Sequence, residues 1–209
     1  MTADIKTTAR SHTVEKIGGT SMLDYATVRD NIILGGGRVD EPYNRIIVVS
    51  AYAGITNRLL EHKKTGHPGV FALFAGSKLE GSWRDEMDLL RSELYALNRE
   101  LFSDSLDVER ANRFVGERLD SAAACLDNLA QLCRHGHFAL DMHLATVREM
   151  LASIGEAQSA WNTVQLLQRD GINARFVDLT GWQSEEHMSL DSRIESAFKD
   201  VDFATSLPI

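Results

Sequence analysis

The sequence contains few cysteines and no hydrophobic run long enough to cross a membrane. Its two cysteines, Cys125 and Cys133, lie eight residues apart in a helical pattern, which would put their Cα atoms about 12 Å apart, too far for a disulfide. We expect both to be reduced thiols in the core. No segment approaches 18 consecutive apolar residues, and the N-terminus lacks the apolar stretch of a signal peptide. The sequence therefore predicts a cytoplasmic protein without a membrane partner.

Positive charge is also scarce. Lysine and arginine number 22 against 30 aspartates and glutamates, which gives a formal net charge of -8 and an isoelectric point near 5.3. Binding to a nucleic-acid backbone requires a basic face, so we expect no nucleic-acid partner. The chain has 209 residues, 44% of them hydrophobic and 25% charged, which is enough for one sizeable core. We therefore expect one domain, or part of one.

The segment Lys16–Ser21 combines a cation, two glycines and two hydroxyls. It follows a strand-like run over residues 13–17 and precedes a helical pattern over residues 23–33. Glycines let backbone N–H groups approach an anion closely, and the positive end of the following helix adds to the attraction. The spacing matches neither a Walker loop nor a dinucleotide fingerprint, and an ordinary strand-to-helix turn would look the same. Two interpretations stay open: a plain turn, or a phosphate-binding loop built from Lys16, Gly18, Gly19, Thr20 and Ser21.

A second strand, loop and helix repeat this arrangement. Residues 45–50 form a continuous β-branched run, typical of a strand buried on both faces of a parallel sheet. Helices are then expected on both faces. Ligands gather at the carboxyl ends of such strands, so Ser50 and Thr56 are expected along one rim with the Lys16–Ser21 loop.

Long amphipathic helices occupy the middle of the chain. Apolar side chains recur every three or four residues over 83–101 and again over 108–133, with a break between, which predicts a helical hairpin at about 82–134. A third helix is predicted from about Asp141 to Asp170. Gly155 interrupts it, which indicates either a helix start or a close approach by another segment. Glu156 would then be a carboxylate beside an open patch.

The remaining residues complete an αβ pattern. A strand is predicted over residues 172–179, an amphipathic helix from Asp191 onward and the entry to another strand at residues 207–209. These elements extend the pattern of the first two strands. The fold class is therefore α/β.

Two groups of side chains could be taken for metal ligands. Cys133, His135, His137 and His143 are spaced more loosely than the ligands of a structural zinc site, and we interpret the histidines as surface residues. Asp178 stands at a predicted strand end, where a loop carboxylate is the simpler interpretation. The sequence predicts no metal site.

Three segments resemble, in order and spacing, the signature segments of aspartate kinases. They are residues 14–21 (VEKIGGTS), 48–57 (VVSAYAGITN) and 154–160 (IGEAQSA). The resemblance covers nearly the whole chain, and residues 15–17 and 61–66 look most like the aspartate kinases associated with ectoine biosynthesis. It implies the amino-acid kinase fold, a three-layer αβα sandwich with a mostly parallel sheet and a helical-hairpin insertion.

The resemblance also implies a reaction. In this family the γ-phosphoryl group of ATP, bound with Mg²⁺, passes to the side-chain carboxylate of L-aspartate and gives 4-phospho-L-aspartate. At the matching positions, Lys16 would be the catalytic residue that contacts the transferring phosphate, with Gly18–Ser21 binding the phosphates of ATP. Ser50 and Thr56 would hold the amino acid, and Glu156 would meet its α-ammonium group. The implied partners are L-aspartate, MgATP and further copies of the chain in a homo-oligomer.

The chain departs from the family pattern in two respects. Ile17 stands where the family usually has phenylalanine, a change of packing that leaves Lys16 and the glycines in place. The family's Arg-Gly-Gly-Ser-Asp segment, adenine-binding region and regulatory domains have no counterpart in residues 1–209. We therefore interpret residues 1–209 as the N-terminal part of a catalytic domain, with ATP and Mg²⁺ held largely by residues outside it and with feeble activity or none alone. Two alternatives stay open: an enzyme of the same fold acting on another carboxylate or carbamate, or a non-catalytic fragment that makes a subunit contact.

Overall fold

A computed structural model describes residues 12–35, 42–76, 82–182, 184 and 188–209. Its N-terminal part consists of two strand–loop–helix units, as the sequence predicted. The first contains β1 (Thr13–Ile17), the helical turn η1 (Ser21–Leu23), α1 (Tyr25–Val28) and the π-helical η2 (Arg29–Ile33). The second contains β2 (Arg45–Val49), α2 (Ile55–Leu59) and α3 (Val70–Gly76).

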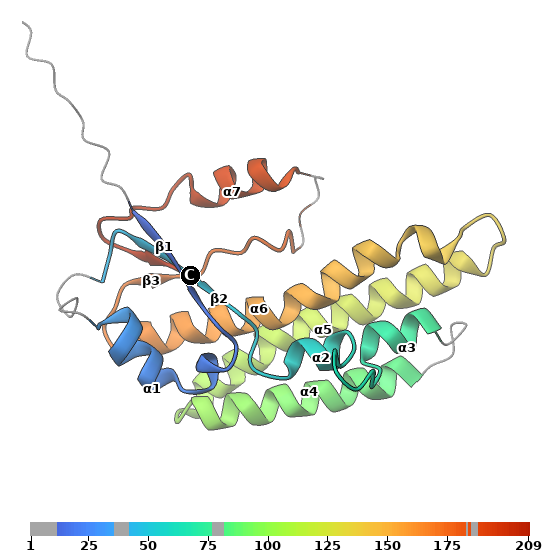
Figure 1. The fold of residues 1–209 in the computed structure, drawn as a ribbon, viewed down its shortest axis with the longest axis horizontal. Coiled ribbons are helices and arrows are strands. Elements are labelled where there is room, and N and C mark those ends of the chain that lie inside the picture. Colours follow the sequence, from blue (N-terminus) through green and yellow to red (C-terminus); the bar gives the residue numbers. More distant parts are fainter. Residues whose placement is uncertain (1–11, 36–41, 77–81, 183, 185–187) are drawn as a thin grey trace, which may run out of the picture.

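Three long helices run side by side through most of the molecule (Figure 1). They are α4 (Ser82–Leu101), α5 (Ser105–Cys133) and α6 (Leu144–Arg169), with the turn η3 (Leu140–Met142) leading into α6. The chain then forms β3 (Ala174–Arg175), α7 (Leu190–Phe198) and β4 (Leu207–Pro208). Within the described ranges, we find no helix with the length and apolar character that a bilayer crossing demands.

The strands pair in parallel. β1 pairs with β2, and β3 pairs with β4, which also lies beside β2. On one face of the first pair Ile17 and Ile47 are buried, whereas on the other face Val14 and Val48 are 63% and 43% exposed. Figure 1 shows α7 and α6 on opposite sides of the strands, but α7 contains no buried residue. One face is therefore well covered and the other only partly, in contrast to the expectation from residues 45–50.

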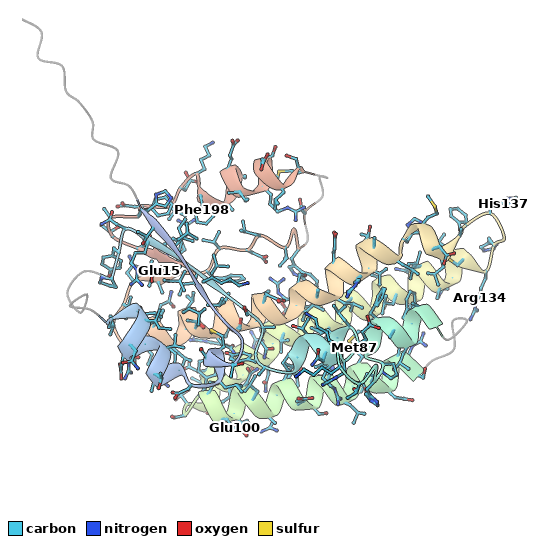
Figure 2. All side chains as sticks on the ribbon, viewed as in Figure 1. Glu15, Met87, Glu100, Arg134, His137 and Phe198 are labelled. Carbon is cyan, nitrogen blue, oxygen red and sulfur yellow. The ribbon has the colours of Figure 1, made fainter. Side chains whose placement is uncertain are left out.

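Apolar side chains from α4, α5 and α6 fill the space between these helices (Figure 2). Trp83 is 1% exposed and meets Phe74 of α3 edge-on, with ring centroids 5.9 Å apart. The two predicted stripes supply much of this core, including Met87, Leu90, Leu94, Val115, Leu119 and Leu126. The predicted break lies at Asp104, whose side chain caps α5 by accepting the N–H of Leu106 at 2.8 Å.

A buried amide network joins the three long helices. Asn98 of α4 donates to Asn112 of α5 at 2.9 Å and accepts from Gln158 and Asn162 of α6 at 3.2 and 2.9 Å. Asn98, Gln158 and Asn162 are fully buried. Sliding one helix along another would leave buried amides unpaired, which costs free energy. The network therefore fixes the register of α6 against the hairpin.

Several local expectations are corrected. α6 continues without a break through Gly155, and the predicted strand over 172–179 is confined to Ala174–Arg175, because β4 pairs with it over only two residues. Cys125 and Cys133 are free, but neither is in the core as predicted: Cys125 is exposed and Cys133 is half-buried, since neither belongs to the buried stripe of α5. The three histidines are exposed as predicted, and His137 lies at the end of the molecule far from the strands (Figure 2).

Candidate functional site

The parallel pairing of β1 and β2 brings together the two loops that the sequence singled out. Ile17 lies opposite Val49, so the Lys16–Ser21 loop and Ser50 leave the strands at the same edge. The N–H of Ser50 donates to the carbonyl of Ile17 at 3.1 Å and extends the ladder by one bond. The carboxyl edge of a parallel sheet is where ligands bind.

The Lys16–Ser21 loop differs from expectation at the helix that follows it. Lys16 is exposed, and the N–H of Ser21 donates to the carbonyl of Gly18 at 3.0 Å. α1 has only four residues, and Asp24 caps it by accepting the N–H of Thr27 at 3.0 Å. The helix end that was expected to attract an anion is thus already met by a carboxylate. Attraction must come from Lys16 and from N–H groups of the loop.

The loop after β2 turns at Gly54, where φ is 90°. Glycine adopts this left-handed conformation at little cost, unlike other residues. Thr56 follows in the first turn of α2 and is half-buried, as is Ser50. Both candidate hydroxyls therefore lie on one short segment that starts beside the Lys16–Ser21 loop.

Ala51 is wedged between glycines of the two other motif segments. A Cβ atom on Gly19 would lie 2.5 Å from the carbonyl oxygen of Ala51. A Cβ atom on Gly155 would lie 2.8 Å from the Cβ atom of Ala51 and 3.2 Å from Cγ2 of Ile55. Only glycine permits segments to approach so closely. Gly155 thus marks a close approach within a continuous helix, which is one of the two alternatives that the sequence left open.

We predict that Gly155→Ala lowers the free energy of unfolding by about 1 kcal/mol, even though alanine is the better helix former by a similar amount. The added methyl group would press on Ala51 and Ile55. Gly116→Ala in α5 is the control, because its new Cβ would lie 2.7 Å from the hydroxyl oxygen of Tyr95 and 3.6 Å from a guanidinium nitrogen of Arg91, which are the ends of side chains rather than the packed carbon atoms of Ala51 and Ile55. Urea denaturation compares the two variants, and equal changes would contradict the packing argument.

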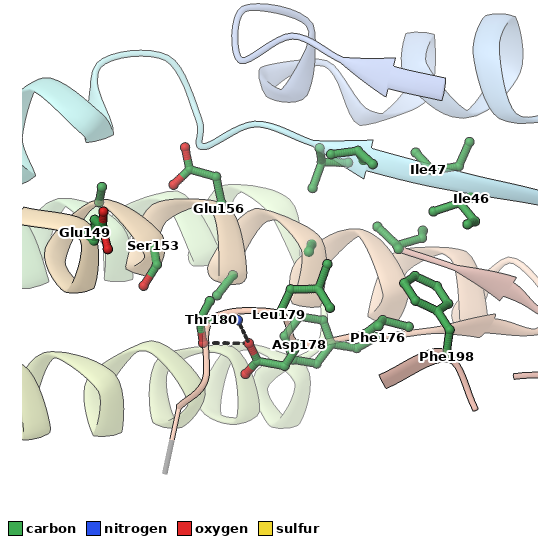
Figure 3. A pocket seen from close by; sticks show the side chains of 17 residues that line it. Ile46, Ile47, Glu149, Ser153, Glu156, Phe176, Asp178, Leu179, Thr180 and Phe198 are labelled. Atoms are coloured by element: carbon green, nitrogen blue, oxygen red, sulfur yellow. Dashed lines mark hydrogen bonds between the residues drawn. The ribbon is translucent and has the colours of Figure 1, made fainter. Parts of the chain in front are cut away.

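Glu156 follows Gly155 and points toward the segment that leaves β2 (Figure 3). Burial raises the pKa of its carboxyl group, while backbone N–H groups of Glu156 and Ala51 and the charge of Lys16 oppose that rise. Its Oε2 atom is buried and has no hydrogen-bond partner within the described residues. A buried carboxylate oxygen without a donor is costly. Glu156 is therefore placed to accept hydrogen bonds from a cationic ligand.

A cavity of about 450 Å³ opens beside Glu156, between β2, α6 and the segment after β3 (Figure 3). Most of its wall is apolar and includes Ile46, Phe176 and Phe198. Polar groups gather along α6, where Ser153 and Glu156 contribute to the lining. Glu156 is the candidate residue that lines this cavity, whereas Lys16, Ser50 and Thr56 are not part of its wall.

Asp178, on another wall of the cavity, forms an ion pair with Arg118 of α5. Its carboxylate accepts from Arg118 at 2.5 Å and from the N–H of Thr180 at 2.9 Å. Arg118 is 4% exposed and lies over the rings of Phe114 and Trp182, 4.5 and 4.9 Å from their centroids. Burial alone would raise the pKa of Asp178, but hydrogen bonds from Thr180 and Arg118 lower it below its usual range. These bonds support the interpretation of Asp178 as a loop carboxylate.

Two residues at this place were not singled out from the sequence. Ala51 joins the three segments, and Ser159, fully buried on α6, donates its hydroxyl to the carbonyl of Ser50 at 2.7 Å. Both lie inside the motif segments, and Ser159 lies three residues after Glu156, near it on the helix surface. The segments that carry Lys16, Ser50 and Glu156 thus meet at Ala51, with Thr56 further along the segment after β2.

Comparison with known proteins gives two similarities. The chain is 50% identical over 198 residues to the aspartate kinase Ask_Ect of Stutzerimonas stutzeri (strain A1501), a match that covers 95% of this chain and 42% of that protein. The crystal structure of E. coli aspartokinase III in complex with aspartate and ADP matches with a TM-score of 0.50 and 24% identity, over 80% of this chain and 31% of that one. No family model matches the sequence.

These similarities confirm the resemblance to aspartate kinases that the three motif segments indicated. The structural likeness shows that the fold is that of an aspartokinase, here mostly helical with small parallel pairs of strands. The chain spans less than half the length of the curated relative.

Proposed function

We propose that the chain forms part of an aspartate kinase that transfers the γ-phosphoryl group of ATP to the side-chain carboxylate of L-aspartate. The observation that carries the proposal is the meeting of three motif segments at Ala51, between Gly19 and Gly155. The identity of 50% to Ask_Ect over 95% of the chain supports it. So does the fold of aspartokinase III, a protein crystallised with aspartate and ADP.

The amino acid would be held by opposite charges and hydroxyls. Glu156 would pair with the α-ammonium group, which would supply the donor that its buried Oε2 atom lacks among the described residues. Ser50 and Thr56 would donate hydrogen bonds to the carboxylates. Charge-assisted bonds of this kind are the strong ones in ligand sites. A substrate with one ammonium and two carboxylates needs such a mixture.

The phosphate would be met by Lys16 and the glycine loop. The amino acid's side-chain oxygen attacks the γ-phosphorus as the bond to the bridging oxygen of ADP breaks, and charge spreads over the transferring oxygens. Lys16 would stabilise that charge. Among the described residues, the N–H groups of Gly19 and Thr20 make no hydrogen bond within the chain, so they could serve as donors, with Gly18 and Ser21 shaping the loop.

The described residues offer a place for the phosphates of ATP but no clear site for Mg²⁺. The Lys16–Ser21 loop suits the phosphates of a nucleotide. Among the described residues, however, no group of three or more His, Cys, Asp or Glu side chains could hold a metal ion, and magnesium prefers carboxylate, phosphate and water oxygens. We therefore assign the phosphates of ATP to the loop and assign Mg²⁺ to none of these residues.

The proposal also covers the place of residues 1–209 within a larger domain. Residues 1–209 would be the N-terminal part of an amino-acid kinase catalytic domain, with the hairpin at about 82–134 as an insertion. The exposed Val14 and Val48 would be covered by a further layer of a three-layer αβα sandwich in the cytoplasmic, ectoine-associated enzyme. The long hairpin would offer a surface for a homo-oligomer, which gel filtration would detect.

The proposal is tested by an ATP-dependent hydroxamate assay, in which hydroxylamine traps the acyl phosphate. The assay is run on the 209-residue chain and on the complete gene product, with L-aspartate, N-acetyl-L-aspartate and carbamate as acceptors. We expect the complete gene product to form hydroxamate with L-aspartate and not with the acetylated analogue, which lacks the α-ammonium group. Phosphorylation of carbamate alone, or no ADP release with any acceptor, would overturn the proposal.

A further inference from the structure

Ser159 connects α6 to the end of β2. It is fully buried, and its Oγ atom lies 2.7 Å from the carbonyl oxygen of Ser50 and 3.1 Å from that of Glu156. Serine hydroxyls inside helices commonly bond to the preceding turn of their own helix. Here the shorter contact leaves the helix and reaches a residue 109 positions earlier in the chain. Ser159 therefore joins two elements that are distant in sequence.

This bond fixes one peptide group at the candidate site. The carbonyl of Ser50 and the N–H of Ala51 belong to the same planar unit, so holding the oxygen sets the direction of the N–H. That N–H lies near the carboxylate of Glu156 and favours its charged form, which lowers the pKa of the group. The preceding N–H, of Ser50, is held by the carbonyl of Ile17 at 3.1 Å. With Ser159 in place, the backbone on both sides of the Ser50 side chain is fixed.

The packing agrees with this arrangement. Gly155 lies one turn before Ser159, and a Cβ atom there would be 2.8 Å from the Cβ atom of Ala51. Gly155, Glu156 and Ser159 are at positions i, i+1 and i+4 and so share one side of α6. The helix thus meets the Ser50–Ala51 peptide through a close contact, a carboxylate and a hydroxyl.

We propose that Ser159 is a positioning residue for substrate binding. It does not touch the amino acid; its hydroxyl holds the Ser50–Ala51 peptide so that the Ser50 side chain and the Glu156 carboxylate face the same ligand. The inference rests on the proposed function, because the ligand is the L-aspartate assigned above.

The test compares Ser159→Ala with Thr163→Val in the complete gene product. Thr163 is 1% exposed and donates its hydroxyl to the carbonyl of Ser159 at 2.7 Å, within α6, so Thr163→Val removes a buried hydroxyl that does not reach β2. We expect Ser159→Ala to raise the KM for L-aspartate about 5- to 30-fold with little change in kcat. Thr163→Val should leave both nearly unchanged, and Ser159→Thr, which keeps a hydroxyl, should restore much of the loss. Equal KM effects of Ser159→Ala and Thr163→Val would overturn the proposal.

A second readout needs no substrate. Amide hydrogen exchange at Ala51, measured without ligand, should be faster in Ser159→Ala and unchanged in Thr163→Val. If the wild-type protein fails to bind or phosphorylate L-aspartate, the proposed function is refuted. If the exchange at Ala51 is the same in both variants, the role of Ser159 is refuted, whatever the substrate.

Discussion

Lys16→Met is expected to lower the turnover number for phosphoryl transfer to L-aspartate by about 100-fold or more. In the proposed mechanism Lys16 stabilises charge that develops on the transferring phosphoryl group, so its loss acts mainly on the transition state. The charge of Lys16 also lowers the pKa of Glu156. The measurement, ADP release at saturating substrates, should therefore be made at a pH high enough to ionise Glu156 in the variant as well.

Lys199→Met is the control for this substitution. Lys199 is an exposed lysine that follows α7, and its replacement removes the same charge and length at a place outside the site. We expect its turnover number to match that of the wild type. A Lys16→Met enzyme that keeps full turnover and loses only affinity for L-aspartate would assign Lys16 to substrate binding instead.

Glu156→Gln is expected to weaken the binding of L-aspartate by about 30-fold or more. The amide has nearly the same size as the carboxylate but carries no charge for the α-ammonium group. Titration calorimetry measures the effect, with Glu117→Gln on the exposed side of α5 as a control that should bind normally. If both variants bound L-aspartate equally well, Glu156 would have no part in recognising the substrate.

The raised pKa of Glu156 predicts a pH dependence. Protonation removes the charge that pairs with the ammonium group, so the affinity of the wild type should fall as the pH drops through this pKa, which lies above the ordinary 4.5. Glu156→Gln should lack this dependence. For folding the sign is opposite: a raised pKa favours the neutral group in the folded state, so this stabilisation is present below 4.5 and is lost as the pH rises. The variant should therefore be more stable than the wild type at neutral pH, by an amount that shrinks in acid.

Sequence patterns predicted the elements that depend on local periodicity. The β-branched runs at residues 13–17 and 45–50 are β1 and β2, and the apolar stripes over 83–101 and 108–133 are α4 and α5. Periodicity could not decide whether a helix begins at Gly155 or continues through it. A glycine inside a helix costs about 1 kcal/mol, but here the contact with Ala51, 104 positions earlier in the chain, accounts for it, and no local rule reports such a contact.

Only part of the candidate site could be predicted, because long-range contacts leave no local signal in the sequence. Lys16, Ser50, Thr56 and Glu156 were singled out by the order and spacing of the motif segments, and their proposed roles are still to be tested. Ser159 was missed because a buried serine on a helix most often bonds within that helix. The cap at Asp24 was missed because the length of α1 depends on how η1 and η2 flank it, which the helical pattern over residues 23–33 does not reveal.

The meeting of the three segments at Ala51 also sets the order of events during synthesis. Glu156 is translated more than 100 residues after Ser50, which at about 5–20 residues per second is a delay of about 5–20 s. Until α6 has emerged from the ribosome, Ala51 has no helix to pack against. The carbonyl of Ser50 likewise has no hydrogen-bond donor from Ser159. The nascent chain can therefore form the hairpin of α4 and α5 before α6 is available, whereas its candidate ligand site cannot assemble until α6 has been made.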